Sequence, residues 1–206
     1  MTDFNRKNHW ENIYETKILK EVSWYQSKPE ASLEFILKMN LPKDSAIIDI
    51  GGGDSFLVDY LLDLGFSNIS VLDISKKAIE RAQKRLGTKA ALVKWIVSDI
   101  TEFNPKEKYD FWHDRATFHF LTNQEDVRKY VESTEKSMNQ NGVLFIGTFS
   151  ENGPKKCSGI EIKQYSDESL TAVFQNSFVQ TENFTTDHKT PFDTIQNFVF
   201  CGFKKI

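Results

Sequence analysis

The sequence predicts an α/β protein in which a mostly parallel sheet carries helices on both faces and an antiparallel hairpin forms one edge. Between residues 45 and 149, short apolar runs alternate with stretches that place apolar residues at helical spacing. Parallel strands joined through helices produce this alternation, because each crossover must cover the sheet. After residue 177 the pattern changes to period-two alternation around a turn-prone connection, which is typical of an antiparallel hairpin.

The N-terminal arm is expected to be ordered. It contains too much aromatic surface for a disordered tail, in the residues Trp10, Tyr14, Trp24 and Tyr25. No repeat, low-complexity tract or linker divides the 206 residues, so residues 1–206 are expected to form one domain. Residues 1–40 would supply the arm and a first helix, and residues 41–206 the core.

Each element is predicted from a local pattern. Apolar runs predict strands at 46–50, 68–74, 93–99, 109–114 and 143–149, and hairpin strands at 178–188 and 196–205. Helical spacing predicts helices at 29–39, 55–66, 75–87, 123–142 and 166–176.

Residue types at the ends of these helices support the assignments. Ser75 and Asn123 are expected to cap their helices, and the Asn-Gly pair at 141–142 is expected to stop the second of them. Pro29 suits a first helical turn. In the helix that follows it, the buried face is expected to contain Leu33, Ile36 and Leu37.

Composition excludes several function classes. A formal net charge of −3 without a basic block gives no reason to expect nucleic acid as a partner. No apolar run approaches the ~20 residues of a membrane span, and the polar N-terminus resembles no targeting signal, so a cytoplasmic protein without membrane contact is expected. Cys157 and Cys201 lie far apart without a CxxC pair, which predicts neither a disulfide nor a zinc site.

The turn after the first strand, "DIGGGDS", is the first candidate binding element. Gly51, Gly52 and Gly53 let the backbone turn sharply and approach a ligand closely. The next strand ends in Asp73, where a carboxylate can accept hydrogen bonds from both ribose hydroxyls of a nucleoside. Together these features predict a nucleoside-containing ligand at the carboxyl ends of the strands.

Two details distinguish this turn from a dinucleotide site. The pattern G-x-G-x-x-G fails at Phe56, which leaves less room for a pyrophosphate. Asp49 stands just before the glycines, and its charge suits a cationic amino group better than a phosphate. A ligand with a ribose, a positive amino acid end and no phosphate is S-adenosylmethionine.

The motifs "DIGGGDS", "VLDIS", "VSDIT" and "YDFWHDRATFHF", in this order, resemble those of class I S-adenosylmethionine-dependent methyltransferases, and the resemblance covers most of the chain. It implies a Rossmann-like sheet of seven strands and S-adenosylmethionine as the cofactor. Ser55 replaces a frequent third glycine and is expected to cap the next helix. The implied cofactor-binding residues are Trp24, Asp49, Gly51, Gly52, Gly53, Asp73, Ile74, Ser98, Asp99, Ile100, His113 and Asp114.

In the same resemblance, the fourth strand ends where the methyl group meets its acceptor. Arg115 and His119 are therefore expected on the acceptor side in catalytic roles, Arg115 by binding an acceptor carboxylate and His119 by removing a proton. Each has a structural alternative, an ion pair for Arg115 and a buried packing role for His119. Asp110 is expected to be structural. Because His113 and His119 lack the i, i+4 spacing of a helical zinc pair, no metal site is predicted.

Several functions stay open at this point. A methyltransferase acting on a small-molecule nucleophile is favoured by the short chain and the "DRATFH" stretch, which resembles a segment of thiopurine S-methyltransferases. The same stretch also resembles a segment of protein lysine methyltransferases. A nicotinamide-dependent oxidoreductase is disfavoured by the missing third glycine. In the first hypothesis, the aromatic residues of the arm form a lid over the cofactor.

Overall fold

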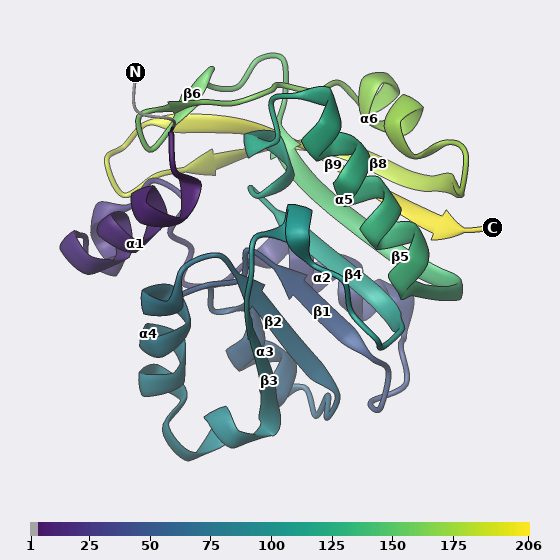
Figure 1. The fold of residues 1–206 in the computed structure, drawn as a ribbon, viewed down its shortest axis with the longest axis horizontal. Coiled ribbons are helices and arrows are strands. Elements are labelled where there is room, and N and C mark those ends of the chain that lie inside the picture. Colours follow the sequence, from purple (N-terminus) through teal and green to yellow (C-terminus); the bar gives the residue numbers. More distant parts are fainter. Residues whose placement is uncertain (1–3) are drawn as a thin grey trace.

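The computed structural model describes residues 4–206; residues 1–3 of the predicted arm lie outside the described residues. Figure 1 shows a twisted sheet with helices on both faces, and the C-terminus lies at the end of an edge hairpin. The helices are α1 (Arg6–Thr16), α2 (Glu30–Met39), α3 (Leu57–Asp63), α4 (Lys76–Leu86), α5 (Gln124–Ser137) and α6 (Asp167–Phe174). Short 3-10 turns are η1 (Leu19–Glu21), η2 (Gly87–Leu92), η3 (Ile100–Glu102) and η4 (Phe118–Phe120).

The main sheet contains seven strands in the order β3-β2-β1-β4-β5-β9-β8, which confirms the predicted fold class. The pairs among β1 to β5 are parallel, whereas β9 runs antiparallel to β5 and to β8. These strands are β1 (Ile47–Ile50), β2 (Ile69–Asp73), β3 (Val93–Val97), β4 (Tyr109–Arg115), β5 (Met138–Phe149), β8 (Phe178–Lys189) and β9 (Ile195–Lys205). A separate two-stranded ribbon consists of β6 (Lys156–Cys157) and β7 (Ile160–Glu161).

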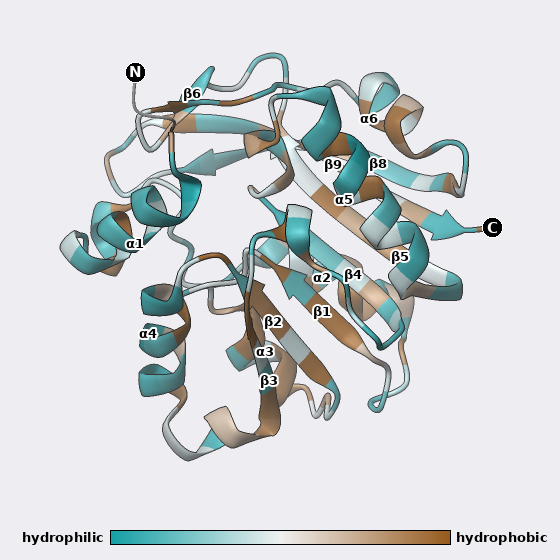
Figure 2. Ribbon diagram, in the orientation of Figure 1, coloured by the Kyte–Doolittle hydropathy of each residue, from teal (hydrophilic) through white to brown (hydrophobic). Residues whose placement is uncertain are grey.

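Alternation along the strands divides the core between the two faces of the sheet. On one face, Ile48 and Trp112 pack with Tyr130 of α5 and Phe174 of α6. On the other face, the neighbouring strand residues pack with α2, α3 and Ile79 of α4. In Figure 2 strands β2 and β3 are mostly hydrophobic in colour, β4 is hydrophilic toward its carboxyl end, and α4 and α5 carry hydrophilic surface. Strand β1 is thus buried on both sides, as its short apolar run predicts, and so is β2, whereas the edge strand β3 leaves Lys94 and Val97 exposed.

Two sequence predictions about helices are wrong. The helix after Asn123 ends at Ser137, because Met138 already pairs with Tyr109 as the start of β5; Asn141, at φ +64°, lies in an irregular part of that strand and stops no helix. In α2, Leu37 is 55% exposed, whereas Phe35 is buried and stacks on Phe145 with ring centroids 4.0 Å apart. The stacking ring determines which face of α2 points inward.

Most other local predictions are confirmed. Ser75 and Asn123 accept hydrogen bonds from backbone N–H groups in the first turns of their helices. Ser55 accepts one from the Leu57 N–H, but the N-cap residue of α3 is Phe56, so the prediction that Ser55 caps this helix is wrong by one position. Asp110 accepts hydrogen bonds from the Ala46 N–H and the Asn139 side chain, which is the structural role expected of it. None of the helices in residues 4–206 is long and apolar enough to cross a membrane.

Candidate active site

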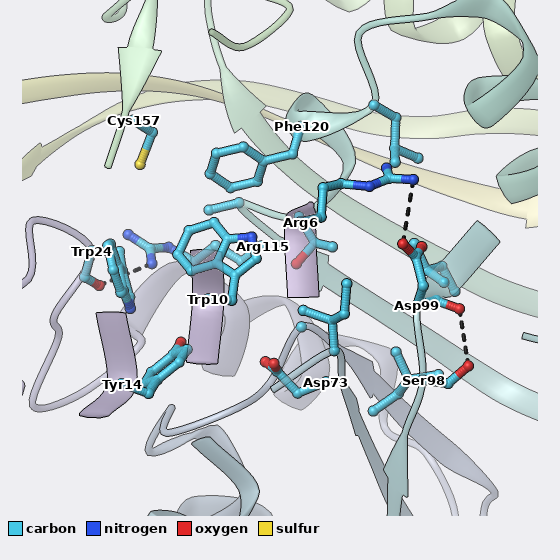
Figure 3. Close-up of a pocket in the computed structure, with 17 residues that line it drawn as sticks. Arg6, Trp10, Tyr14, Trp24, Asp73, Ser98, Asp99, Arg115, Phe120 and Cys157 are labelled. Carbon is cyan, nitrogen blue, oxygen red and sulfur yellow. Dashed lines mark hydrogen bonds and ion pairs between the residues drawn. The ribbon is translucent and has the colours of Figure 1, made fainter. Parts of the chain in front are cut away.

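A cavity lies at the carboxyl ends of the parallel strands, beneath α1 (Figure 3). Open α/β sheets bind their ligands at this edge. Including the open space at its mouth, the cavity has an empty volume of about 730 Å³. We call it the main cavity; the residues that line it include Trp10, Tyr14, Gly51, Asp73, Asp99 and Arg115.

The glycine turn keeps the floor of the main cavity free of side chains. Gly51 has φ +64°, and a Cβ there would lie 1.8 Å from Oγ1 of Thr117. Gly53 has φ +36°, and its Cβ would lie 2.6 Å from Oδ2 of Asp73. Because L side chains rarely adopt these angles and have no space here, both positions require glycine. Gly53 itself is not among the residues that line a cavity, so it acts as a spacer beside Asp73.

Asp73 presents one oxygen to the main cavity. It ends β2, and its Oδ1 accepts a hydrogen bond from the backbone N–H of Ser75 at 2.7 Å. Its Oδ2 has no hydrogen-bond partner among the described residues. Burial raises the pKa of Asp73 to about 7, opposed by the Ser75 N–H and assisted by the negative charge of Asp49. This carboxylate is therefore a strong acceptor that a ligand's hydroxyl groups can satisfy.

The far end of the main cavity is formed by residues that follow β2 and β3. Ile74, Ser98, Asp99 and Ile100 line it, and all four are among the residues expected to bind the cofactor. Asp99 accepts a hydrogen bond from the Thr101 N–H and forms an ion pair with Arg6 of α1 at 3.3 Å. The ion pair holds the N-terminal arm over this end of the cavity (Figure 3).

A second hollow adjoins the main cavity over the glycine turn; we call it the side cavity. It is lined by Asp49, Gly52 and His113, while Gly51, Tyr14, Trp24 and Arg115 border both hollows. The side cavity therefore continues the main cavity toward the start of α3.

Asp49 is held in place by a buried chain of hydrogen bonds. Its Oδ1 lies 2.6 Å from Nδ1 of His113, and Nε2 of His113 lies 2.8 Å from Oγ of Ser32 in α2. When Nδ1 of His113 carries the imidazole proton, it donates to Asp49, and Nε2 accepts a hydrogen bond from the Ser32 hydroxyl. The other oxygen of Asp49, Oδ2, lies against Gly52, where a Cβ would come within 2.4 Å of it. The carboxylate thus has one fixed oxygen and one oxygen directed over the glycine turn.

Arg115 places a guanidinium between the two cavities. Its Nη1 donates to the backbone oxygen of Trp24 at 3.2 Å, and the guanidinium lies 4.8 Å from the ring centre of Phe198. Its Nη2 is buried without a hydrogen-bond partner. Burial lowers the pKa of Arg115 to about 10, so the group stays cationic at neutral pH.

Asp114 and His119 lie behind the cavity wall. Asp114 accepts hydrogen bonds from the N–H groups of Thr117 and Phe118 and from the Tyr130 hydroxyl, and burial raises its pKa to about 6. Nδ1 of His119 accepts the Phe149 N–H, and burial, with the charge of Arg115, lowers the pKa of His119 to about 3. Neither residue lines a cavity, so their predicted contacts with ligands gain no support from this geometry.

Helix α1 covers the site through two attachments. Arg6 pairs with Asp99 and, at 3.1 Å, with Asp126. At the other attachment, Glu11 accepts hydrogen bonds from the first backbone N–H groups of α4 and from Ser75, which suits a carboxylate at a helix N-terminus. Trp10 and Tyr14 of α1 line the main cavity, and their role as a lid stays a prediction.

The sequence did not reveal every residue of the site. Arg6 and Ser32 belong to no motif, and no sequence signal distinguishes them. Ala116 and Thr117 lie in the "DRATFH" stretch and could have been found; Ala116 has φ +67°, a left-handed conformation uncommon for a non-glycine residue, and both line the main cavity. Cys157 also lines it. Across residues 4–206, no cluster of side chains has the composition of a metal site.

Comparisons of the sequence identify related proteins. Residues 48–144 match a family model described as a methyltransferase domain. The chain is 31% identical over 106 residues to malonyl-acyl-carrier-protein O-methyltransferase 2 of Ilyobacter polytropus, covering 51% of this chain and 39% of that protein. It is 27% identical over 157 residues to EEF1A lysine methyltransferase 2 of Danio rerio, covering 68% of this chain and 66% of that protein. The match thus spans about two fifths of the bacterial relative.

A solved structure shares the whole fold. The N-methyltransferase NodS of Bradyrhizobium japonicum, in complex with S-adenosyl-L-homocysteine, superposes with a TM-score of 0.73 at 15% identity. The superposition covers 98% of this chain and 99% of NodS. At this identity, the likeness shows a common fold.

Proposed function

We propose that the chain transfers the methyl group of S-adenosylmethionine to a small-molecule nucleophile. The premise is that residues 48–144 match a methyltransferase domain and that the chain has the fold of an N-methyltransferase. The observation that carries this proposal is the free Oδ2 of Asp73 beside a glycine turn, inside a cavity covered by α1.

The residues of the two cavities fit the parts of the cofactor. Asp73 would accept hydrogen bonds from the ribose hydroxyls, and Asp99 with the Ile100 backbone would contact the adenine. Asp49 would face the amino group across the space that Gly52 leaves open. A buried carboxylate with an unused oxygen is expected to be paired, and these ligand groups would provide the partners.

When bound, the cofactor supplies a methyl group already activated by a sulfonium charge. The chain needs only to position the acceptor and exclude water, which can contribute several kcal/mol to lowering the barrier. Trp10, Tyr14 and Trp24 would exclude water, because their rings lie close together along the cavity. The ring centroids of Trp10 and Trp24 are 5.6 Å apart, and those of Tyr14 and Trp24 are 6.3 Å apart. His119 has no atom that faces the cavity, so we assign it no proton transfer.

A protein lysine acceptor is the alternative, supported by the Danio rerio relative. Helix α1 favours the small molecule, because it covers the main cavity and leaves a confined space beneath it.

The experiment measures release of S-adenosylhomocysteine when the protein is mixed with S-adenosylmethionine and one of two fractions of a cell extract, its low-mass compounds or its proteins. Release with the low-mass fraction, strongly reduced in an Asp73→Asn variant at limiting S-adenosylmethionine, is the expected result. Release with the protein fraction alone would replace this proposal by the lysine alternative. Release with neither, in a protein that binds S-adenosylhomocysteine, would leave the cofactor assignment standing and refute both acceptor classes for that extract.

A further inference from the structure

The guanidinium of Arg115 lacks the anion that a buried cation usually pairs with. No carboxylate of residues 4–206 lies within ion-pair distance of it, although Arg6, Arg81 and Arg85 each pair with aspartates. Its contacts are a backbone oxygen and the face of Phe198. A buried charge without an ion-pair partner is costly, so such a group in a cavity wall marks a place where a ligand supplies the charge.

The groups around Arg115 provide no hidden counter-charge. His119 and His188 have pKa values lowered first by burial and then by the charge of Arg115, so both are neutral. Burial raises the pKa of Cys157, which keeps it a thiol. Asp49 is the anion that acts on Arg115 from a distance, and it is hydrogen-bonded to His113. The wall between Trp24 and Cys157 is therefore positive.

The charge of the proposed cofactor makes this imbalance larger. A sulfonium ion in the main cavity would lie in the same hollow as the guanidinium, and two cations in a poorly solvated space repel one another. An acceptor with a negative group would offset one of these two positive charges and so reduce the repulsion between them. The unused N–H groups of Nη2 lie in the plane of the guanidinium, which is the geometry that binds a carboxylate.

From this geometry we propose that Arg115 forms an anion-binding subsite for the methyl acceptor, and that the acceptor is a small molecule bearing a carboxylate. This inference rests on the proposed function and adds the substrate class to it. It gives the buried Nη2 a partner, and it explains why the guanidinium borders the main cavity without an internal ion pair.

The first test uses benzoate and its uncharged counterpart benzamide, added to protein saturated with S-adenosylhomocysteine. Trp10 and Trp24 line the cavity, so their fluorescence reports occupation. We expect saturable binding of benzoate and none of benzamide. Arg115→Gln should weaken benzoate binding about tenfold or more, as expected for the loss of a charge-assisted hydrogen bond. Arg128→Gln is the matched control, because Arg128 is exposed and paired with Glu125 and Glu132.

A competing role for Arg115 is to hold the carboxylate of the cofactor's own methionine. Titrations with S-adenosylhomocysteine and with 5′-methylthioadenosine, which lacks the amino acid part, separate the two roles. Unchanged affinity of Arg115→Gln for both supports the proposal. Loss of S-adenosylhomocysteine binding with retained methylthioadenosine binding would assign Arg115 to the cofactor and overturn it. Methylthioadenosine binding also reports that the variant is folded, and Arg115→Lys provides a second variant that keeps the charge.

The second test fractionates the low-mass extract by anion exchange before the S-adenosylhomocysteine release assay. Acceptor activity in the retained, anionic fraction is the expected result. Activity in the unretained fraction would refute the anionic acceptor while leaving the methyltransferase assignment intact. Absence of S-adenosylhomocysteine binding to the wild-type protein would instead refute the proposed function itself.

Discussion

Replacing Asp73 by asparagine should separate the ribose contact from the fold of the site. In the structure, Oδ1 already accepts the Ser75 N–H at 2.7 Å, and the asparagine oxygen can keep this bond. The amide nitrogen then replaces Oδ2, which removes the free charged acceptor. A hydrogen bond to a charged group contributes about 1.5–3 kcal/mol, so the dissociation constant for S-adenosylhomocysteine should rise about 10- to 150-fold.

The assay is calorimetric titration with S-adenosylhomocysteine and with its 2′-deoxy analogue. In the wild type the deoxy analogue should bind more weakly, and in Asp73→Asn the difference between the two ligands should become smaller. Thermal unfolding of both proteins controls for damage to the fold. Equal weakening of both ligands, or no weakening, would contradict the assignment of Asp73 to the ribose.

The pH dependence of the same titration gives an independent check. The pKa of Asp73 is raised to about 7 in the free protein, and ribose hydroxyls that donate to the carboxylate would lower it in the complex. Binding then requires loss of a proton below pH 7, so affinity should fall as the pH decreases from about 7, by at most tenfold per pH unit. Asp73→Asn should lose this component of the pH dependence.

Other contacts of the site predict equally specific outcomes. Ser32→Ala or His113→Asn should weaken the binding of S-adenosylhomocysteine about fivefold, because a buried hydrogen bond is lost, and should leave the binding of 5′-methylthioadenosine unchanged in a titration. Equal weakening of both ligands would contradict a role of these residues at the amino acid end of the cofactor. In urea denaturation, Gly51→Ala should cost about 1–3 kcal/mol more than Gly65→Ala, which shares the positive φ but meets no atom within 4 Å; equal costs would rule out the clash. Glu11→Gln should weaken the binding of S-adenosylhomocysteine about two- to fivefold and accelerate proteolysis within α1, because the N-terminus of α4 loses a charged partner. An unchanged rate of cleavage would show that this contact does not hold α1 over the cavity.

Local chemistry made most of the fold predictable. The apolar runs that became β1 and β2 are buried on both faces of the sheet, so their sequence alone identified them. The edge strand β3 was also identified, although Lys94 and Val97 are exposed. The cap residues Ser75 and Asn123 were equally visible, because short polar side chains before a helical pattern have one main use. Helix α1 was not predicted as a helix, since its apolar face is supplied mainly by aromatic rings that cover a ligand site.

Errors arose where tertiary contacts decided the outcome. The Asn-Gly pair at 141–142 resembles a helix stop, but pairing with β4 extends β5 back to Met138. In α2, stacking of Phe35 on Phe145 turns Leu37 outward.

The site was predictable where residues follow the ends of strands. Asp73, Ser98, Asp99 and Arg115 line the main cavity. Asp114, the penultimate residue of β4, and His119, which follows β4, are buried behind the cavity wall. The sequence places Asp114 and His119 near the site, but it does not show which side chains of this segment point into the main cavity. Ser32 could not be found at all, because its partner His113 is distant in sequence.

The measurement that tests the central claim most directly is titration of the wild-type protein with S-adenosylhomocysteine and, separately, with NAD. The glycine turn, Asp49 and Asp73 predict saturable binding of S-adenosylhomocysteine and none of NAD, because Phe56 occupies the place of the third glycine of a dinucleotide turn. Binding of NAD by a folded protein that does not bind S-adenosylhomocysteine would contradict the account and restore the oxidoreductase hypothesis.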